Sequence, residues 1–523
     1  MKKEKAPLSK SGAHLVAAGI FLSRIMGLVR QKIFAHYFGN SDAGDAFYAA
    51  LKIPNFSQNL LGDGVLSASF IPVYANMLAQ GDSKAADKIA GIIGSLLALL
   101  NAILSLAGIF AAPFLIDLIA PGFEGEKREL TIKLVQIFFP ATGLLVMSAW
   151  CLGILNSHRK FFLSYVAPVF WNLAIIIALV FYGKTEGQNA LAVYTAWAVL
   201  VGSLLQVGVQ LPSVFKYAPH VSPGFNFKLN PVKRIFKSFV PVVMSRGVVQ
   251  ISAYIDSIIG SLLPSGAVSA LAYAQSLYML PISLFGMSVS AAELPAMSSL
   301  KGSKDEIAES LRKRINAGLK QISFFVIPST IAFLILGDVV ISGVLQGGLF
   351  QQTETHFVWG VLAGAAVGLL ATTLGRLYSS AFYSLNDTKT PLNYAFFRVI
   401  LTIFFGYLFA LKLPKIFNFP ESWGAYGLTL SGGLLGWLEF FLLKKGLEKK
   451  IGKTELAFAF QVKVWASAIL SSMAALFCKL LLADKVHYIL KSGIILGVYG
   501  VLYFVISALL GVEESQKLRK KFF

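Results

Sequence analysis

Long apolar stretches separated by short polar segments run along almost the whole chain. A helix that crosses the hydrocarbon core of a bilayer needs about 20 mostly apolar residues, and about 14 stretches meet this length. They predict an all-α polytopic membrane protein, because only helices and closed barrels satisfy their backbone inside lipid. The predicted spans are 14–38, 45–79, 88–117, 130–155, 162–182, 190–214, 233–263, 267–299, 317–346, 355–385, 392–411, 424–445, 457–482 and 490–511.

The composition excludes a soluble protein. Of the 523 residues, 56% are hydrophobic and only 14% are charged, and the mean hydropathy is +0.69. Lysine and arginine outnumber aspartate and glutamate by 46 to 26. This excess does not indicate a nucleic-acid partner, because no hydrophilic domain is long enough to hold a basic surface.

The positive charges gather in alternate loops, as the positive-inside rule requires of a membrane protein. One set includes the basic segments 1–5, 216–237, 301–314 and 444–453, whereas the other set is poorer in lysine and arginine, apart from exceptions such as Lys127 with Arg128. With an even number of helices, this distribution predicts that both termini lie in the cytoplasm. The first apolar stretch is long and contains arginine, so we expect a retained helix rather than a cleaved signal peptide.

Two pairs of similar segments indicate an internal repeat. VLSASFIPVYANML at 65–78 resembles SVSAAELPAMSSL at 288–300, and RKFFLSYVAPVF at 159–170 resembles TKTPLNYAFFRV at 388–399. The paired segments are six helices apart, so both halves enter the membrane in the same direction. Parallel repeats of this kind are typical of transporters whose substrate site lies between two lobes.

Two arginines, Arg24 and Arg30, lie inside the first predicted span. Charged side chains at bilayer depth are costly, and they normally face a bundle interior or a watery cavity. Their spacing of six residues points them about 120° apart on a helix. They therefore predict the border of a wide cationic cavity that holds an anionic substrate.

The second span carries a polar stripe along one helical face. We expect Asp45, Lys52 and Asn55 to contact substrate, with Asp45 and Lys52 able to pair, while a seam buried against another helix is the alternative. Pro54 is expected to kink the helix, and Gly62 and Gly64 to loosen the next turn. Asp42 fits a helix cap. The residues expected to gate or support the site here are Pro54, Asn59, Asp63 and Gly64.

The second half has its own intramembrane charges. Arg246 and Arg376 are candidate substrate ligands, although Arg376 also fits an internal hydrogen-bonded clamp. Asp256 and Glu293 are candidate gating or structural residues. There is no phosphate loop of the Walker type, no HExxH and no paired CxxC. We therefore expect no metal, no cofactor, no direct use of ATP and no enzymatic activity, with Cys151 and Cys478 as small hydrophobic side chains.

At these residues the chain resembles the MurJ/MviN family of lipid II flippases, within the multidrug/oligosaccharidyl-lipid/polysaccharide exporter superfamily. The resemblance rests on SRIMGLVRQKIFAHYFG, DAFYAALKIPN, GDGVLSASFIPVY and NDTKTP. It covers nearly the whole chain. The cavity arginines of the family match Arg24 and Arg30, and its conserved acid matches Asp45.

The resemblance implies two pseudo-symmetric six-helix lobes around a central cavity, with two further helices that form a groove for a lipid tail. The lobes would be 1–216 with helices 1–6 and 217–448 with helices 7–12, and the groove would be 449–523 with helices 13–14. It implies that the protein moves lipid II, an undecaprenyl-pyrophosphate disaccharide-pentapeptide, across the bacterial inner membrane by alternating access. Membrane lipids and cell-wall synthesis proteins would be further partners.

Two departures from the family pattern affect this interpretation. In the family an acidic residue often follows the second arginine, whereas this chain has Gln31 at that position. Some members carry an arginine and a glutamate in the eighth helix, where this chain has Ser276 and Met279. The positive charge of the second lobe must therefore come from other residues. Arg246 is the first candidate and Arg376 the second.

Other functions remain open from the sequence. A flippase for another polyprenyl-pyrophosphate-linked oligosaccharide would need the same cationic site. A membrane glycosyltransferase and a scaffold for cell-wall enzymes are also compatible with the chain. An exporter of cationic drugs is disfavoured, because it would need an acidic cavity.

Overall fold

The computed structural model describes residues 10–482 and 486–522, and it describes residues 10–17, 63–65, 68, 238, 240–253 and 518–522 by their backbone alone. Nearly all of the described chain is helical, and the described strand pairing is one isolated bridge between Gly347 and Phe350. The predicted all-α class is confirmed. The chain divides into two compact units, Met1–Leu262 and Leu263–Phe523.

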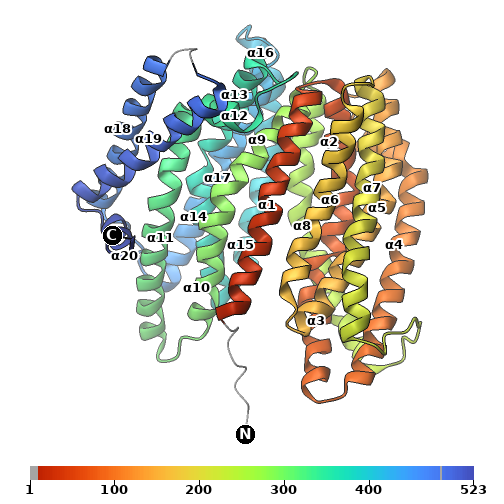
Figure 1. Cartoon of the computed structure of the whole chain (residues 1–523). Helices are drawn as coiled ribbons and strands as arrows, with labels where there is room; N and C mark the ends of the chain where they lie inside the picture. The colour runs from red at the N-terminus through yellow and green to blue at the C-terminus, as the bar shows by residue number, and fades with distance from the viewer. Residues whose placement is uncertain (1–9, 483–485, 523) are drawn as a thin grey trace. The chain divides into compact units, whose positions relative to one another are not determined.

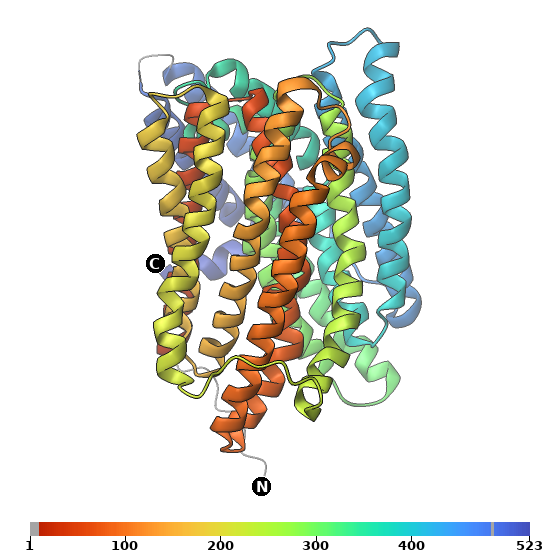
Figure 2. The same cartoon turned by 90° about the vertical axis from the view of Figure 1, so that its right-hand side faces the viewer.

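The first unit contains eight helices among its described residues, and several of them run alongside one another in Figure 2. Its main core lies between α3, α4 and α5, where Phe70, Tyr74 and Trp150 are buried. The Trp150 indole donates a hydrogen bond to the Ala90 carbonyl at 3.0 Å. The helices are α1 (Lys10–Phe38), α2 (Asp42–Leu61), α3 (Asp63–Ala79), α4 (Ser83–Ile119), α5 (Gly125–Ser157), α6 (Phe161–Tyr182), α7 (Gln188–Tyr217) and α8 (Asn230–Ser261).

The second unit begins with a helix interrupted by a π-helical segment and ends with a helical hairpin and a short polar helix (Figure 1). Its elements are α9 (Ala267–Pro281), η1 (Ile282–Met287), α10 (Ser288–Ser298), α11 (Lys304–Ile335), α12 (Gly337–Leu345), α13 (Gln352–Ala366), α14 (Leu369–Ser384), α15 (Lys389–Tyr407), η2 (Leu408–Lys412), α16 (Leu413–Ile416), α17 (Trp423–Ile451), α18 (Phe458–Leu482), α19 (Tyr488–Leu509) and α20 (Glu513–Phe522).

The predicted spans correspond to helical segments of the described chain. Ten segments are long and apolar enough to cross a membrane, and α13 with α14, bent by 41°, would make an eleventh. The other three segments are α1, α2 with α3, and α8, which hold many of the predicted site residues.

Several predicted spans differ from the structure in detail. Those expected at 317–346 and 355–385 are each two helices, α11 with α12 and α13 with α14. The span expected at 317–346 begins earlier, at Lys304, because Ser303 and Glu306 form a capping box. The span expected at 45–79 is two helices. Helix α2 continues through Pro54, and the interruption comes at Gly62, where a Cβ atom would lie 2.5 Å from the Gln58 carbonyl oxygen.

The segments of the internal repeat occupy similar local structures. The first pair lies in α3 and α10, and each of these short helices follows an interrupted helix. A left-handed residue lies at or just before the start of each segment of the second pair, Arg159 at φ 60° and Asn386 at φ 59°. In both turns the next amide bonds five residues back, from Lys160 to Leu155 and from Asp387 to Phe382, as in a Schellman cap. These parallels support the predicted repeat.

The C-terminal hairpin is fastened to α11 through a proline. Pro328 has no amide hydrogen, so it cannot bond the carbonyl oxygen of Phe324 one turn earlier. The hydroxyl of Tyr503 donates to that oxygen at 2.5 Å, and Tyr499 donates to the Pro328 carbonyl at 2.7 Å. Buried residues of α11, α12, α18 and α19 complete this contact.

Candidate functional site

The two arginines of α1 have different surroundings. Helix α1 packs closely on α6, since a Cβ atom on Gly19 would lie 2.9 Å from the Cβ of Tyr165. Arg24 is exposed, and it makes no hydrogen bond or ion pair within the part of the chain that the structure describes. The guanidinium carbon of Arg30 lies 4.8 Å from the centre of the Trp171 ring on α6. Stacking of this kind orients an arginine but leaves its donors available for other contacts.

A second unused donor lies beside Arg30. The indole Nε1 of Trp171 is buried and has no hydrogen-bond partner. Tyr48 of α2 also interacts electrostatically with Arg30. A buried donor without a partner costs free energy, so Arg30 and Trp171 form a place where an anion would satisfy donors that the protein leaves unused.

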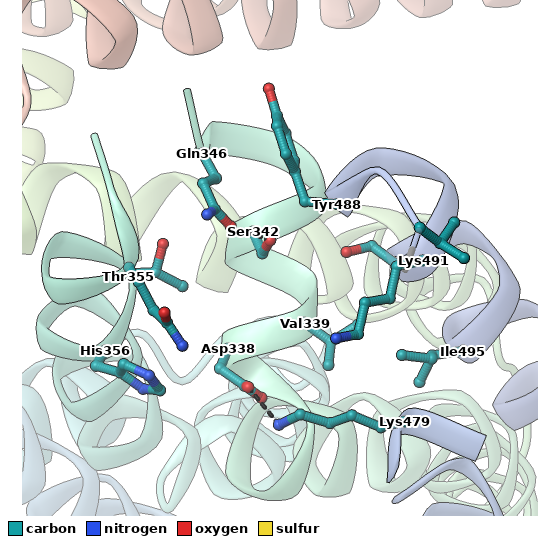
Figure 3. Close-up of a pocket in the computed structure, with 13 residues that line it drawn as sticks. Asp338, Val339, Ser342, Gln346, Thr355, His356, Lys479, Tyr488, Lys491 and Ile495 are labelled. Atoms are coloured by element: carbon teal, nitrogen blue, oxygen red, sulfur yellow. Dashed lines mark hydrogen bonds and ion pairs between the residues drawn. The ribbon is translucent and has the colours of Figure 1, made fainter. Parts of the chain in front are cut away.

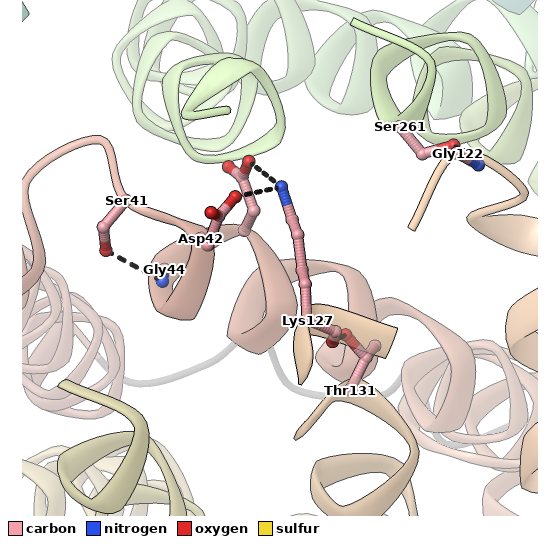
Figure 4. A network of polar contacts seen from close by, with 8 residues as sticks. Ser41, Asp42, Gly44, Gly122, Lys127, Thr131 and Ser261 are labelled. Atoms are coloured by element: carbon pink, nitrogen blue, oxygen red, sulfur yellow. Dashed lines mark hydrogen bonds and ion pairs between the residues drawn. The ribbon is translucent and has the colours of Figure 1, made fainter. Parts of the chain in front are cut away.

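Asp45 lies in the first turn of α2, as does Asp42, and Figure 4 shows Asp42 beside Lys127. Lys127 of α5 contacts the carboxylates of Asp42 at 2.7 Å and Asp45 at 2.8 Å. The Asp45 side chain is 1% exposed. The expected pairing of Asp45 with Lys52 is therefore not found, because Lys127 takes that place. The cap of α2 is Ser41, which accepts from the Gly44 amide, rather than Asp42.

Lys52 faces α8 in the middle of α2. Its ammonium group donates to the hydroxyl of Ser257, and the hydroxyl of Tyr254 donates to the Lys52 carbonyl at 3.0 Å. Asp256 is exposed and interacts electrostatically with Lys52. Asn55 is half-buried and Asn59 is exposed on the same helix. The stripe thus joins α2 to α8 at Lys52.

The structure does not describe the side chains of three predicted site residues. Asp63 and Gly64 belong to the start of α3, and Arg246 belongs to α8, but the structure describes only their backbone. Their expected roles stay predictions.

In the second unit, Arg376 belongs to a polar cluster inside the helices. Its Nε is buried and has no hydrogen-bond partner. It interacts electrostatically with Tyr278 of α9, Arg398 of α15 and Glu439 of α17. Arg398 and Glu439 form an ion pair at 2.6 Å. The cluster has two arginines and one carboxylate, so it holds a net positive charge.

Glu293 is placed differently. It pairs with Arg314 of α11 at 3.0 Å, and both side chains are partly exposed. This ion pair joins α10 to α11, and the expected gating or structural role of Glu293 stays a prediction. Ser276, at a position where the family can carry an arginine, donates to the Ala272 carbonyl of its own helix.

The sequence interpretation missed Lys127, Trp171 and Arg398. Lys127 was visible as an exception to the charge pattern of the loops, so its mismatch was a signal. Arg398 lies within an apolar span, and the cost of a buried charge could have identified it. Trp171 carried no comparable signal, because tryptophan is common in membrane helices.

The helical fold and its intramembrane arginines define a multi-pass membrane protein of the transporter class. The family model described as Lipid II flippase MurJ matches residues 34–499. The chain therefore belongs to the MurJ family. The family and the fold are those of transporters, not of enzymes.

Individual relatives agree with this assignment. The chain is 30% identical to a probable lipid II flippase MurJ of Rhizobium tropici, over 95% of this chain and 93% of the relative. It is 31% identical to the lipid II flippase MurJ of Burkholderia cenocepacia, over 83% of each.

Solved structures agree as well. A structure of lipid II flippase MurJ matches with a TM-score of 0.76 at 25% identity, over 95% of this chain and 98% of that one. A multidrug resistance MATE family transporter shares the fold alone, with a TM-score of 0.66 at 17% identity, over 84% of this chain and 98% of that one.

Proposed function

We propose that this protein flips lipid II from the inner to the outer leaflet of the bacterial inner membrane by alternating access. Membership of the MurJ family is the observation that carries the proposal. A pyrophosphate with attached sugars cannot cross hydrocarbon unaided, so the transporter must supply a polar path for the headgroup.

The chemistry of Arg24, Arg30 and Trp171 supports recognition of the pyrophosphate. Guanidinium groups bind phosphate oxygens through charge-assisted hydrogen bonds, which are stronger than neutral ones. Arg30 is held over the Trp171 ring, and the indole Nε1 has no partner. In this proposal Arg24 captures the headgroup, while Arg30 and Trp171 bind it at a second position.

Lys52 and Asn55 are proposed as further headgroup ligands on α2, with Asp256 as the counter-ion of Lys52. Asp45 is proposed to act with Lys127 at the end of that helix. An ion pair buried at a helix end can exchange partners when the helices move, which gives these residues a part in the transport cycle.

Arg376 is the proposed anion ligand of the second unit, and Arg246 on α8 is a separate proposed ligand. The buried Nε of Arg376 and the nearby Arg398 support this role, because both leave positive charge within the bundle. An anionic headgroup would offset this charge, and its differential binding to the two transport states would drive the conformational change.

The proposed arrangement in the membrane follows the charge pattern. Both termini would lie in the cytoplasm, and residues 1–216 and 217–448 would act as the two lobes. Residues 449–523 would guide the lipid tail, since α18 and α19 expose large apolar side chains such as Phe477 and Leu480. Cell-wall synthesis proteins are proposed partners.

The test is complementation of a bacterium depleted of its own lipid II flippase. Wild type should restore growth and outer-face lipid II, whereas Arg24→Ala should not, although it reaches the membrane. Arg128→Ala is the matched control, because Arg128 pairs with the exposed Asp117 and lies outside the proposed site. This control should rescue as well as wild type.

The other outcomes contradict parts of the proposal. Rescue by Arg24→Ala at normal expression would remove Arg24 from the site. Failure of the expressed wild type, together with rescue of a strain that lacks a surface-polysaccharide flippase, would favour another polyprenyl-pyrophosphate-linked oligosaccharide.

A further inference from the structure

A polar pocket in the second unit shares no lining residue with the headgroup ligands proposed above, although part of its lining belongs to the segment 449–523 proposed to guide the lipid tail. Its volume is about 190 Å³, and residues of α12, α13, α18 and α19 line it. Pockets for drug-sized ligands have volumes of roughly 300–1,000 Å³. This pocket therefore fits a small polar group and excludes a disaccharide-pentapeptide.

Three basic side chains and one carboxylate belong to the lining. Lys479, Lys491 and His356 surround Asp338, as Figure 3 shows. Lys479 pairs with the Oδ2 atom of Asp338 at 2.5 Å. An ammonium group has three donors and a neutral imidazole has one, so these side chains can hold a phosphate while the ion pair remains.

The other oxygen of Asp338 has a different requirement. Its Oδ1 atom is buried and has no hydrogen-bond partner. The nearby hydroxyl of Ser342 does not satisfy it, because that hydroxyl donates to Gln346. A buried carboxylate oxygen without a donor is costly, so a ligand that brings a donor to Asp338 would be favoured over one that brings none.

Apolar surface adjoins the pocket on both helices of the hairpin. Leu480 is 77% exposed, Leu481 69% and Leu490 60%. These residues are next to Lys479 and Lys491 in the chain, so exposed apolar side chains that could contact acyl chains flank the basic lining residues. Basic pockets between transmembrane helices can bind lipid headgroups, and free phosphate would make no use of the apolar side chains.

We propose that this pocket binds the headgroup of a glycerophospholipid whose phosphodiester is followed by a hydrogen-bond donor, as in phosphatidylethanolamine or phosphatidylglycerol. The phosphate lies against Lys479, Lys491 and His356. The ammonium or hydroxyl group donates to Asp338 Oδ1, and the acyl chains lie on α18 and α19. Phosphatidylcholine has no such donor and binds more weakly.

The test is native mass spectrometry of the purified full chain with equal amounts of the three lipids, matched in their acyl chains. Wild type should retain phosphatidylethanolamine and phosphatidylglycerol about tenfold more than phosphatidylcholine, the size of one charge-assisted hydrogen bond. Lys491→Gln should lower retention of all three. Asp338→Asn should remove the preference for ethanolamine over choline.

The control is Lys415→Gln, which removes an exposed lysine outside the pocket and should change nothing. Lys491→Gln leaves the Asp338–Lys479 pair intact, so it stays informative if Asp338→Asn unfolds. Equal retention of the three lipids by wild type, or Lys491→Gln behaving as the control, would overturn the proposal. So would a rise in melting temperature with inorganic phosphate alone equal to that with phosphatidylethanolamine.

Discussion

At the scale of single residues, the intramembrane charges fall into two groups. Asp45 and Glu293 have ion-pair partners on neighbouring helices, so their immediate effect is to join helices. Arg24, Arg30 and Arg376 lack a carboxylate in direct contact within the described chain. Charges without a counter-ion are the ones that a charged substrate can neutralise, which is why we assign substrate contact to the arginines.

The pair formed by Asp45 and Lys127 should matter for stability. Lys127→Met removes one cation from the buried carboxylate of Asp45, and the loss of one partner of a buried pair costs about 3–5 kcal/mol. We expect a clear fall in melting temperature, measured on purified protein in detergent. Combining Lys127→Met with Asp45→Asn should recover part of the loss, because no uncompensated charge is then buried.

A control makes this prediction specific. Lys313→Met removes a lysine from an exposed pair with Glu309, and surface pairs contribute at most about 1 kcal/mol. A melting temperature for Lys127→Met that matches this control would show that the contact with Asp45 stabilises nothing.

At the scale of elements, the motif NDTKTP has a clear structural role. Asn386 takes the left-handed conformation that ends α14. Asp387 accepts from the amide and the hydroxyl of Thr390 at the start of α15, and from Lys450 at the end of α17. These three donors lower the pKa of Asp387 to about 2. The motif fixes a turn between helices and does not itself indicate a substrate contact.

This lowered pKa gives a pH dependence with a definite sign. The carboxylate of Asp387 stabilises the fold above its ordinary pKa of 3.8, and the stabilisation is lost as the pH falls toward the folded value. Asp387→Asn should therefore have its full effect on the melting temperature at pH 5. The decrease relative to wild type should become progressively smaller as the pH falls from about 4 to 2. A constant difference across this range would contradict the assigned contacts.

The elements also show what the sequence could predict. Apolar length located the spans to within a few residues in most cases, because the bilayer sets the length of a helix. The sequence predicted one span at 45–79, with a kink at Pro54 and a looser turn at Gly62. In the structure α2 continues through Pro54 and ends at Leu61, because a membrane helix can continue through proline. The partner of Asp45 was missed, because ion pairs between distant helices depend on packing that apolar periodicity does not encode.

At the scale of the whole molecule, the family assignment and the intramembrane arginines point to the same substrate chemistry. The candidate ligands on α1 were predictable, because a charge in an apolar stretch is visible in the sequence. Arg376 was also predictable by this criterion. Arg398 met the same criterion and was missed, and its interaction and that of Glu439 with Arg376 follow only from the packing.

The most direct test of lipid II flipping uses the purified chain in vesicles. Fluorescent lipid II is placed in one leaflet, and its appearance in the other is followed with a quencher that cannot cross the membrane. Wild type should flip lipid II much faster than empty vesicles do. Arg30→Ala should be slower by roughly tenfold or more, since it removes charge-assisted hydrogen bonds to phosphate. Wild-type vesicles that flip no faster than empty ones, under conditions where a MurJ relative is active, would contradict the account.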